Sequence, residues 1–168
     1  MIRVEIAGFT YLGLDHLILP LRAGVLAADG RALGGVPERL AMLARQLKIH
    51  VLADPADARM GAMLDGVPCK WVSLPHLGQA EAKRNYVEQV GVDHAAAIGH
   101  GRGDVPMLEA AALGIAIFGG LGLSCEAARH ADLAVRHTVD ALGLLLWPDR
   151  LIQSLTLSTD NAGVAGAH

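Results

Sequence analysis

The residues with the greatest potential for chemistry lie in one glycine-rich turn. Positions 99–104 read Gly-His-Gly-Arg-Gly-Asp and follow a short apolar run over 95–98. Gly99 and Gly101 let the backbone approach a ligand closely, because glycine has no Cβ. Asp104 offers a carboxylate that can bind a hard cation, but aspartate is also favoured as the N-cap of a following helix. The spacing alone leaves ligand binding and helix capping equally open.

Two other side chains of the turn have alternative interpretations. His100 and Asp104 could hold zinc or iron, with His50 or Asp54 as a third ligand. The alternative is that His100 only fills space, and the sequence favours it because no metal-site spacing supports a third ligand. Arg102 suits an anion or a partner's carboxylate, although an exposed turn arginine is also ordinary.

The elements around this turn alternate between strands and helices. Three short strands are predicted within 2–20, and later strands at 49–53, 68–74, 95–99, 114–118 and 132–135. Helices are predicted at 37–48, 56–64, 79–90, 105–113, 124–130, 138–146 and 149–157. Strands that alternate with helices form a parallel sheet covered on both faces. The sequence therefore predicts an α/β fold in which the turn lies at the carboxyl ends of the strands, where ligands bind.

The chain is predicted to form one domain with a C-terminal tail. Its 168 residues suit a single core, and no linker or repeat divides residues 1–157. Residues 158–168 have no hydrophobic periodicity, and we expect a mobile C-terminal tail there. Residues 141–157 hold more apolar side chains than one helix face needs, so the surplus could form a contact surface.

Composition argues against several partners. A net charge of −3 does not provide the basic footprint of a nucleic-acid-binding protein. No apolar run reaches the roughly 20 residues needed to span a membrane. The N-terminus begins with an alternating strand rather than a signal peptide, which predicts a cytoplasmic location. Cys69 and Cys125 lie far apart and are expected to be isolated thiols.

With its elements in this order, the chain resembles the haloacid-dehalogenase (HAD) superfamily. It looks closest to the small proteins akin to the phosphorylation domain of P-type ATPases. The resemblance covers about residues 2–155 and depends mostly on the Gly99–Asp104 turn, which is similar to the family's Gly-Asp/Asn-Gly-x-x-Asp motif. Lys83 matches the family's lysine. The resemblance implies a doubly wound, mostly parallel sheet with an N-terminal β-hairpin and a small or absent cap.

In that family, four motifs converge on one phosphoryl group. An aspartate attacks phosphorus, and a second acid, a hydroxyl residue, a lysine and an acidic Mg²⁺-binding turn assist it. The resemblance places inert side chains at three of these positions: Leu21 at the nucleophile, Ala23 at the general acid/base and Ala53 at the hydroxyl residue. His100 stands at the first polar position of the acidic turn.

These substitutions favour a catalytically degenerate protein, because leucine and alanine can neither attack phosphorus nor coordinate magnesium. The main interpretation is a pseudophosphatase that acts as a binding, regulatory or complex subunit, with a protein partner or as a homo-oligomer. Its ligand site would be a relict formed by Lys83, Gly99, His100, Gly101, Arg102 and Asp104. No cofactor is expected beyond weak Mg²⁺ binding at Asp104. One alternative is an Mg²⁺-dependent HAD-type phosphatase of a small phosphorylated substrate. The other is a sensor of a small ligand or metal.

Overall fold

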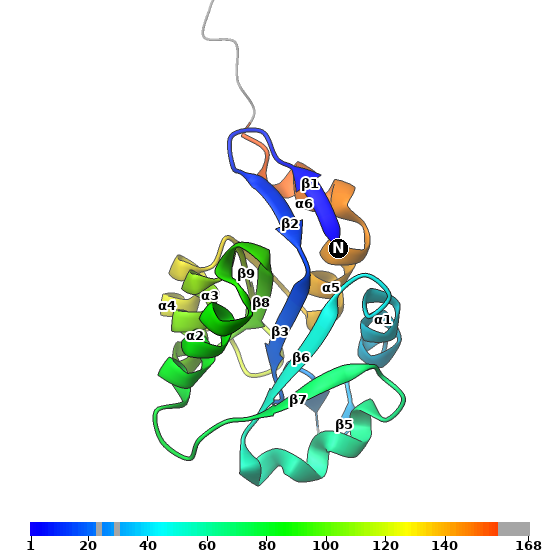
Figure 1. Cartoon of the computed structure of the whole chain (residues 1–168), viewed down its shortest axis with the longest axis vertical. Helices are drawn as coiled ribbons and strands as arrows, with labels where there is room; N and C mark the ends of the chain where they lie inside the picture. The colour runs from blue at the N-terminus through cyan, green and yellow to red at the C-terminus, as the bar shows by residue number, and fades with distance from the viewer. Residues whose placement is uncertain (23–24, 29–30, 158–168) are drawn as a thin grey trace, which may run out of the picture.

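The centre of the molecule is a six-stranded sheet in which every neighbouring pair of strands is parallel (Figure 1). The computed structural model describes residues 1–22, 25–28 and 31–157. The strand order is β10-β9-β8-β3-β6-β7. The strands are β3 (His16–Pro20), β6 (Lys48–Ala53), β7 (Cys69–Ser73), β8 (Ala95–Gly99), β9 (Leu113–Ile117) and β10 (Leu133–Val135). The central strands β8 and β9 are buried along their whole length, as expected for a parallel sheet covered on both faces.

Helices and short hairpins complete the fold. The helices are α1 (Val36–Leu43), α2 (Gln79–Val90), α3 (Val105–Ala110), α4 (Cys125–His130), α5 (Thr138–Leu146) and α6 (Pro148–Leu155). Three segments form 3₁₀ helix: η1 (Pro55–Leu64), η2 (Val92–His94) and η3 (Arg102–Asp104). Two antiparallel hairpins lie outside the main sheet: β1 (Ile2–Glu5) with β2 (Tyr11–Leu14), and β4 (Ala27–Ala28) with β5 (Arg31–Ala32).

Helices cover both faces of the sheet (Figure 1). On one face, α1 and α5 bury side chains such as Leu40 and Leu142 in the larger apolar cluster. On the other face, α2 and α3 contribute Val87, Met107 and Leu108 to a second cluster. Burying such side chains drives the layers together, and it leaves the carboxyl ends of the strands free to form a site.

The predicted α/β fold, a doubly wound and mostly parallel sheet with an N-terminal hairpin, is confirmed. Within the described residues, the segment from β3 to α1 holds only the β4–β5 hairpin, in keeping with a small cap.

The predicted tail at 158–168 and the acid/base position Ala23 lie outside the described residues. No helix in the described part of the chain is long and apolar enough to cross a membrane.

Three predicted helices differ most from the structure. The helix predicted at 37–48 ends at Leu43, because the amide of Lys48 already donates to Asp15 O at 2.8 Å as β6 joins the sheet. Residues 56–64 lie within the 3₁₀ segment η1. The helix predicted at 105–113 ends at Ala110, since β9 already begins at Leu113.

Gly114 provides a test of the packing between α3 and β9. A Cβ at this position would meet the carbonyl oxygen of Leu108 at 2.5 Å, and that backbone atom cannot rotate away. Gly114→Ala should therefore lower the free energy of unfolding by about 1–3 kcal/mol, the usual cost of overpacking. Urea unfolding measures it, with Gly120→Ala as the matched control because a Cβ there meets nothing within 4 Å. Equal stability of the two variants would contradict this packing.

Candidate functional site

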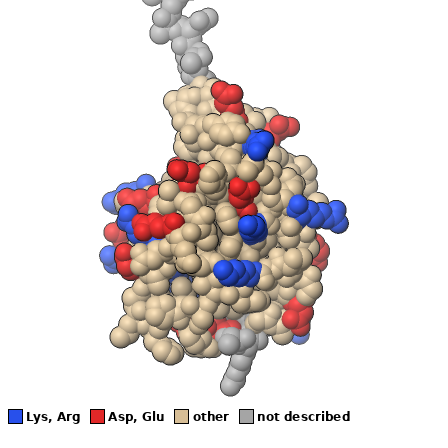
Figure 2. Space-filling view, viewed as in Figure 1, with Lys and Arg blue, Asp and Glu red and all other residues tan. Residues whose placement is uncertain are grey.

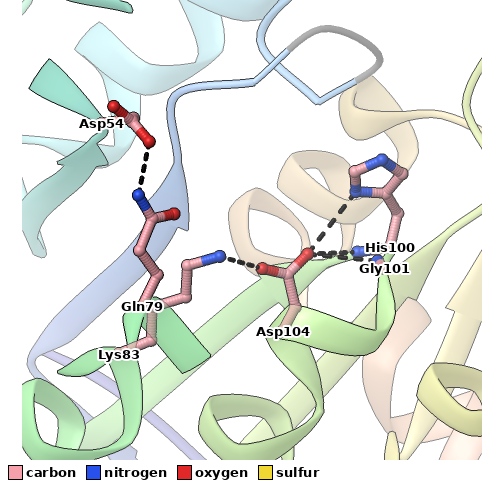
Figure 3. A network of polar contacts seen from close by, with 6 residues as sticks. All are labelled: Asp54, Gln79, Lys83, His100, Gly101 and Asp104. Carbon is pink, nitrogen blue, oxygen red and sulfur yellow. Dashed lines mark hydrogen bonds and ion pairs between the residues drawn. The ribbon is translucent and has the colours of Figure 1, made fainter. Parts of the chain in front are cut away.

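A buried ion pair joins α2 to the glycine-rich turn after β8. Lys83 Nζ lies 2.6 Å from Asp104 Oδ1, and the two side chains are 2% and 0% exposed (Figure 3). Neither charge is stable in a protein interior alone, since removing an ion from water costs several kcal/mol. Each residue therefore holds the other in place. The pair confirms that the two residues with the clearest family-like positions lie together.

The second oxygen of Asp104 closes the turn. Asp104 Oδ2 accepts hydrogen bonds from the amides of His100, at 2.9 Å, and Gly101, at 3.2 Å. The Asp104 side chain does not cap α3, so the capping hypothesis is wrong and the carboxylate instead folds back onto its own turn. Gly99 makes this possible, because a Cβ there would lie 2.6 Å from Asp104 Cβ.

His100 lies beside the carboxylate without a full hydrogen bond to it. Its Nδ1 atom is 3.5 Å from Asp104 Oδ2, and this buried nitrogen has no hydrogen-bond partner among the described residues. Burial raises the pKa of Asp104, but His100, the charge of Lys83 and the hydrogen bonds outweigh it and hold the pKa well below its ordinary value. Asp104 is therefore a carboxylate at neutral pH.

A second acidic residue lies across α2 from this pair. Asp54 follows β6, where its Oδ1 accepts the amide of Ala56 at 2.9 Å and its Oδ2 accepts Gln79 Nε2. These two hydrogen bonds lower the pKa of Asp54; burial opposes them, and the charges of His76 and Arg22 contribute less in the lowering direction. Asp54 is consequently ionised near neutral pH.

One helix connects the two carboxylates. Gln79 and Lys83 are four residues apart on α2 and so lie on the same face of the helix, with Gln79 turned to Asp54 and Lys83 to Asp104 (Figure 3). Sequence reasoning missed Gln79 and considered Asp54 only as a metal ligand. The signal that could have found Asp54 is its place directly after a predicted buried strand.

The position that the sequence resemblance assigns to the nucleophile is apolar. Leu21 is 1% exposed, belongs to the larger apolar cluster, and donates its amide to Leu52 O at 2.7 Å. Ala53 is the last residue of β6 and precedes Asp54. Arg22, which follows Leu21, is exposed and acts electrostatically on Asp54, and sequence reasoning missed it. The charged groups described at this edge of the sheet are Arg22, Asp54, Lys83 and Asp104.

Arg102 does not join the ion pair. Its Nε donates to Glu126 Oε2 at 2.6 Å, and its side chain is 80% exposed. Arg102 was predicted to suit an anion or a partner's carboxylate, and in the structure it pairs with a carboxylate of this same chain, on α4.

The described residues do not form a metal site. Among them, no group of three or more His, Cys, Asp or Glu side chains is arranged to hold a metal ion. Lys83 and two amides already engage Asp104. His50, one proposed third ligand, instead contacts His16 and Tyr86. This donor set does not fit a preformed Mg²⁺ site, which needs several oxygen ligands.

The fold is HAD-like, and solved structures of HAD phosphatases share it. No protein-family model and no curated protein matches the sequence. The chain is similar to 3-deoxy-D-manno-octulosonate 8-phosphate phosphatase from Moraxella catarrhalis, solved with magnesium, phosphate and the sugar acid. The identity is 14% over 85% of this chain and 94% of that one, with a TM-score of 0.59.

Two further structures agree. The cobalt-bound form of the corresponding phosphatase from Haemophilus influenzae is 17% identical over 85% of this chain and 90% of that chain, with a TM-score of 0.59. A HAD phosphatase from Bacteroides thetaiotaomicron is 12% identical over 82% of this chain and 95% of that chain, with a TM-score of 0.53. At these identities the likeness establishes the fold.

These comparisons correct the main functional interpretation from the sequence. A degenerate pseudophosphatase serving as a binding or regulatory subunit is contradicted by the similarity to phosphatases. The error came from giving Leu21, Ala23 and Ala53 more weight than Lys83 and Asp104. The comparisons favour the alternative of a HAD-type phosphatase.

The ion pair generates a stability prediction. Lys83→Met leaves the Asp104 carboxylate buried without its cation, so the free energy of unfolding at neutral pH should fall by about 3–5 kcal/mol. Lys83→Met combined with Asp104→Asn removes both charges and should cost less than the sum of the two single variants. Urea unfolding of all four proteins gives the coupling energy. Additive losses would show that the two side chains do not stabilise each other.

The lowered pKa of Asp104 also predicts acid sensitivity. Its unfolded pKa is about 3.9, and its folded pKa is lower, so its contribution to stability is complete above about pH 5 and disappears as the pH falls further. The stability difference between the wild type and Asp104→Asn should therefore narrow from neutral pH toward pH ~3. Denaturant titrations across this range measure the difference, and a constant gap would refute the assignment.

Proposed function

We propose that the chain is a phosphoric monoester hydrolase of the HAD type that acts on a small phosphorylated molecule. The observation that carries the proposal is the buried Lys83–Asp104 pair at the carboxyl ends of a HAD-like sheet. Support comes from the phosphatases that share the fold, two of which act on a phosphorylated sugar acid by name. The closer likeness to P-type ATPase domains, a protein partner and a cytoplasmic location stay predictions.

Binding of the phosphoryl group would depend on two cations. Lys83 Nζ carries three donors, and in the described structure only Asp104 accepts one of them. Its remaining N–H groups are buried in this structure, so the site would have to open before they could donate to phosphoryl oxygens. Arg22 is exposed at the end of β3 and supplies a second positive charge. A donor held in place, as Lys83 is by Asp104, would stabilise the charge that develops during phosphoryl transfer.

The chemistry must avoid a covalent intermediate at Leu21, because a hydrocarbon side chain cannot attack phosphorus. We assign the attack to a water molecule that transfers its proton to the Asp54 carboxylate. The new P–O bond forms as the ester P–O bond breaks, and the leaving oxygen departs with the electron pair. Asp54 is ionised and can accept the proton, while its lowered pKa makes it a weaker base than an ordinary aspartate. No step is assigned to a metal ion.

Hydrolysis of p-nitrophenyl phosphate tests this proposal, because its leaving group departs without protonation. Mg²⁺ is included, since similar structures contain divalent cations. Asp54→Asn should lower kcat about 10²-fold with little change in KM, the usual effect of losing a general base. Arg22→Gln should raise KM. The matched control is Arg84→Gln, whose arginine is exposed on α2 and pairs with Glu88.

Two results would overturn the proposal. One is a wild-type protein that releases no nitrophenolate above the buffer rate. The other is turnover in Asp54→Asn equal to that of Arg84→Gln, which would remove Asp54 from the chemistry.

A further inference from the structure

Two loops beside the candidate site expose apolar side chains. The loop over 118–124, which reads Phe-Gly-Gly-Leu-Gly-Leu-Ser, joins β9 to α4 and leaves Phe118 52% and Leu121 69% exposed. The loop over 74–78 joins β7 to α2 and leaves Leu77 88% exposed. Both loops begin at the carboxyl ends of their strands, which is the edge where parallel sheets bind ligands.

The first loop lies directly beside the glycine-rich turn. β9 pairs with β8 in a register that places Ala116 opposite Gly99, so the two chains leave the sheet at the same level. Phe118 follows on one of these chains and His100 on the other. At the far end of the loop, Ser124 donates its amide to His100 O at 3.0 Å. The loop is therefore held against the turn at both of its ends.

The second loop lies on the other side of the site. The strand order β9-β8-β3-β6-β7 places β9 next to the strand before the turn, and β7 next to the strand that Asp54 follows. Leu77 lies two residues before Gln79, which donates a hydrogen bond to Asp54. Neighbouring strands are about 4.8 Å apart, so the two loops leave strands that are about 19 Å apart. The polar groups of the site lie between them.

Neither loop offers the polar side chains that a hydroxylated substrate needs. Residues 74–78 and 118–124 contain no Asp, Glu, Asn, Gln, Lys or Arg, and their polar side chains are His76 and Ser124. Ser124 Oγ already accepts the amide of Glu126 at 3.2 Å, as the N-cap of α4. Figure 2 shows few charged groups at the lower left, where the chain between β7 and α2 lies in Figure 1. Because hydroxyl groups that lose water without gaining a partner cost free energy, these loops favour an apolar group.

We propose that the two loops bind the organic part of the substrate and that this part is apolar, so that the protein takes phosphoric monoesters of hydrophobic or aromatic alcohols. Phe118 and Leu121 contact the organic part from one side and Leu77 from the other. The phosphoryl group binds near Lys83, so this assignment rests on the hydrolase function proposed above. Binding measures it without any turnover.

Two phosphonates test the proposal with the full-length protein, because phosphatases do not hydrolyse their C–P bond. Benzylphosphonate has an aromatic organic part, whereas 3-hydroxypropylphosphonate has a hydrophilic one. The wild type should bind the benzyl compound about tenfold more tightly, since part of its ring leaves water on binding. Isothermal titration calorimetry measures both Kd values.

Substitutions in the loops identify the residues responsible. Phe118→Ser, Leu121→Ser and Leu77→Ser should each reduce the preference for benzylphosphonate by about threefold or more. The Kd of the hydrophilic phosphonate should not change, whereas a structural defect would weaken both ligands. All three side chains are exposed, so the variants should fold. The matched control is Met42→Ser, because Met42 is also exposed but lies near the end of α1 that leads to the amino end of β6.

Four results would overturn the proposal. The wild type could bind the two phosphonates equally, or bind neither, or the loop variants could behave as Met42→Ser does. The fourth is dimerisation that Leu121→Ser abolishes, without any preference between the phosphonates, which would make the loops a protein interface. The hydrolase function fails separately: a protein that prefers benzylphosphonate but releases no nitrophenolate from p-nitrophenyl phosphate binds such anions without cleaving them.

Discussion

The requirement that a buried charge must have a partner determines the functional end of this fold. Asp104 lies out of contact with water, so it needs Lys83 and two backbone amides to remain ionised. These contacts of Asp104 fix the position of α2 and the path of the turn after β8. They also require residue 99 to be glycine, because a Cβ there would clash with Asp104. Gln79 lies on the same helix and donates a hydrogen bond to Asp54. One electrostatic constraint therefore organises side chains from three separate segments of the chain.

Sequence reasoning could predict what depends on local pattern. The continuous apolar run of β8 and the alternation of strands with helices gave the parallel sheet, and the family-like spacing pointed to Lys83 and Asp104. It could not predict that η1 would be a 3₁₀ segment or that α1 would end at Leu43, because tertiary contacts decide both. The pairing of Asp54 with Gln79 joins residues 25 positions apart, and no local signal reveals such a contact.

The functional interpretation from the sequence failed for a related reason. It gave the inert residues at family positions, above all Leu21, more weight than polar residues such as Lys83 and Asp104, which it treated as a relict. The structure contains an ionised carboxylate, Asp54, at the end of the neighbouring strand, and a buried lysine with donors to spare. Lys83 and Arg22 are the cations near Asp104 and Asp54.

Phosphorus NMR titration of the protein with inorganic phosphate tests the central claim most directly, because it detects binding independently of turnover. If the Lys83–Asp104 pair organises a phosphoryl site, the wild type should shift and broaden the phosphate resonance. The double variant Lys83→Met/Asp104→Asn, which has no buried charge to unfold it, should not. Equal phosphate binding by the two proteins would contradict the account and show that the ion pair only holds α2 against the sheet.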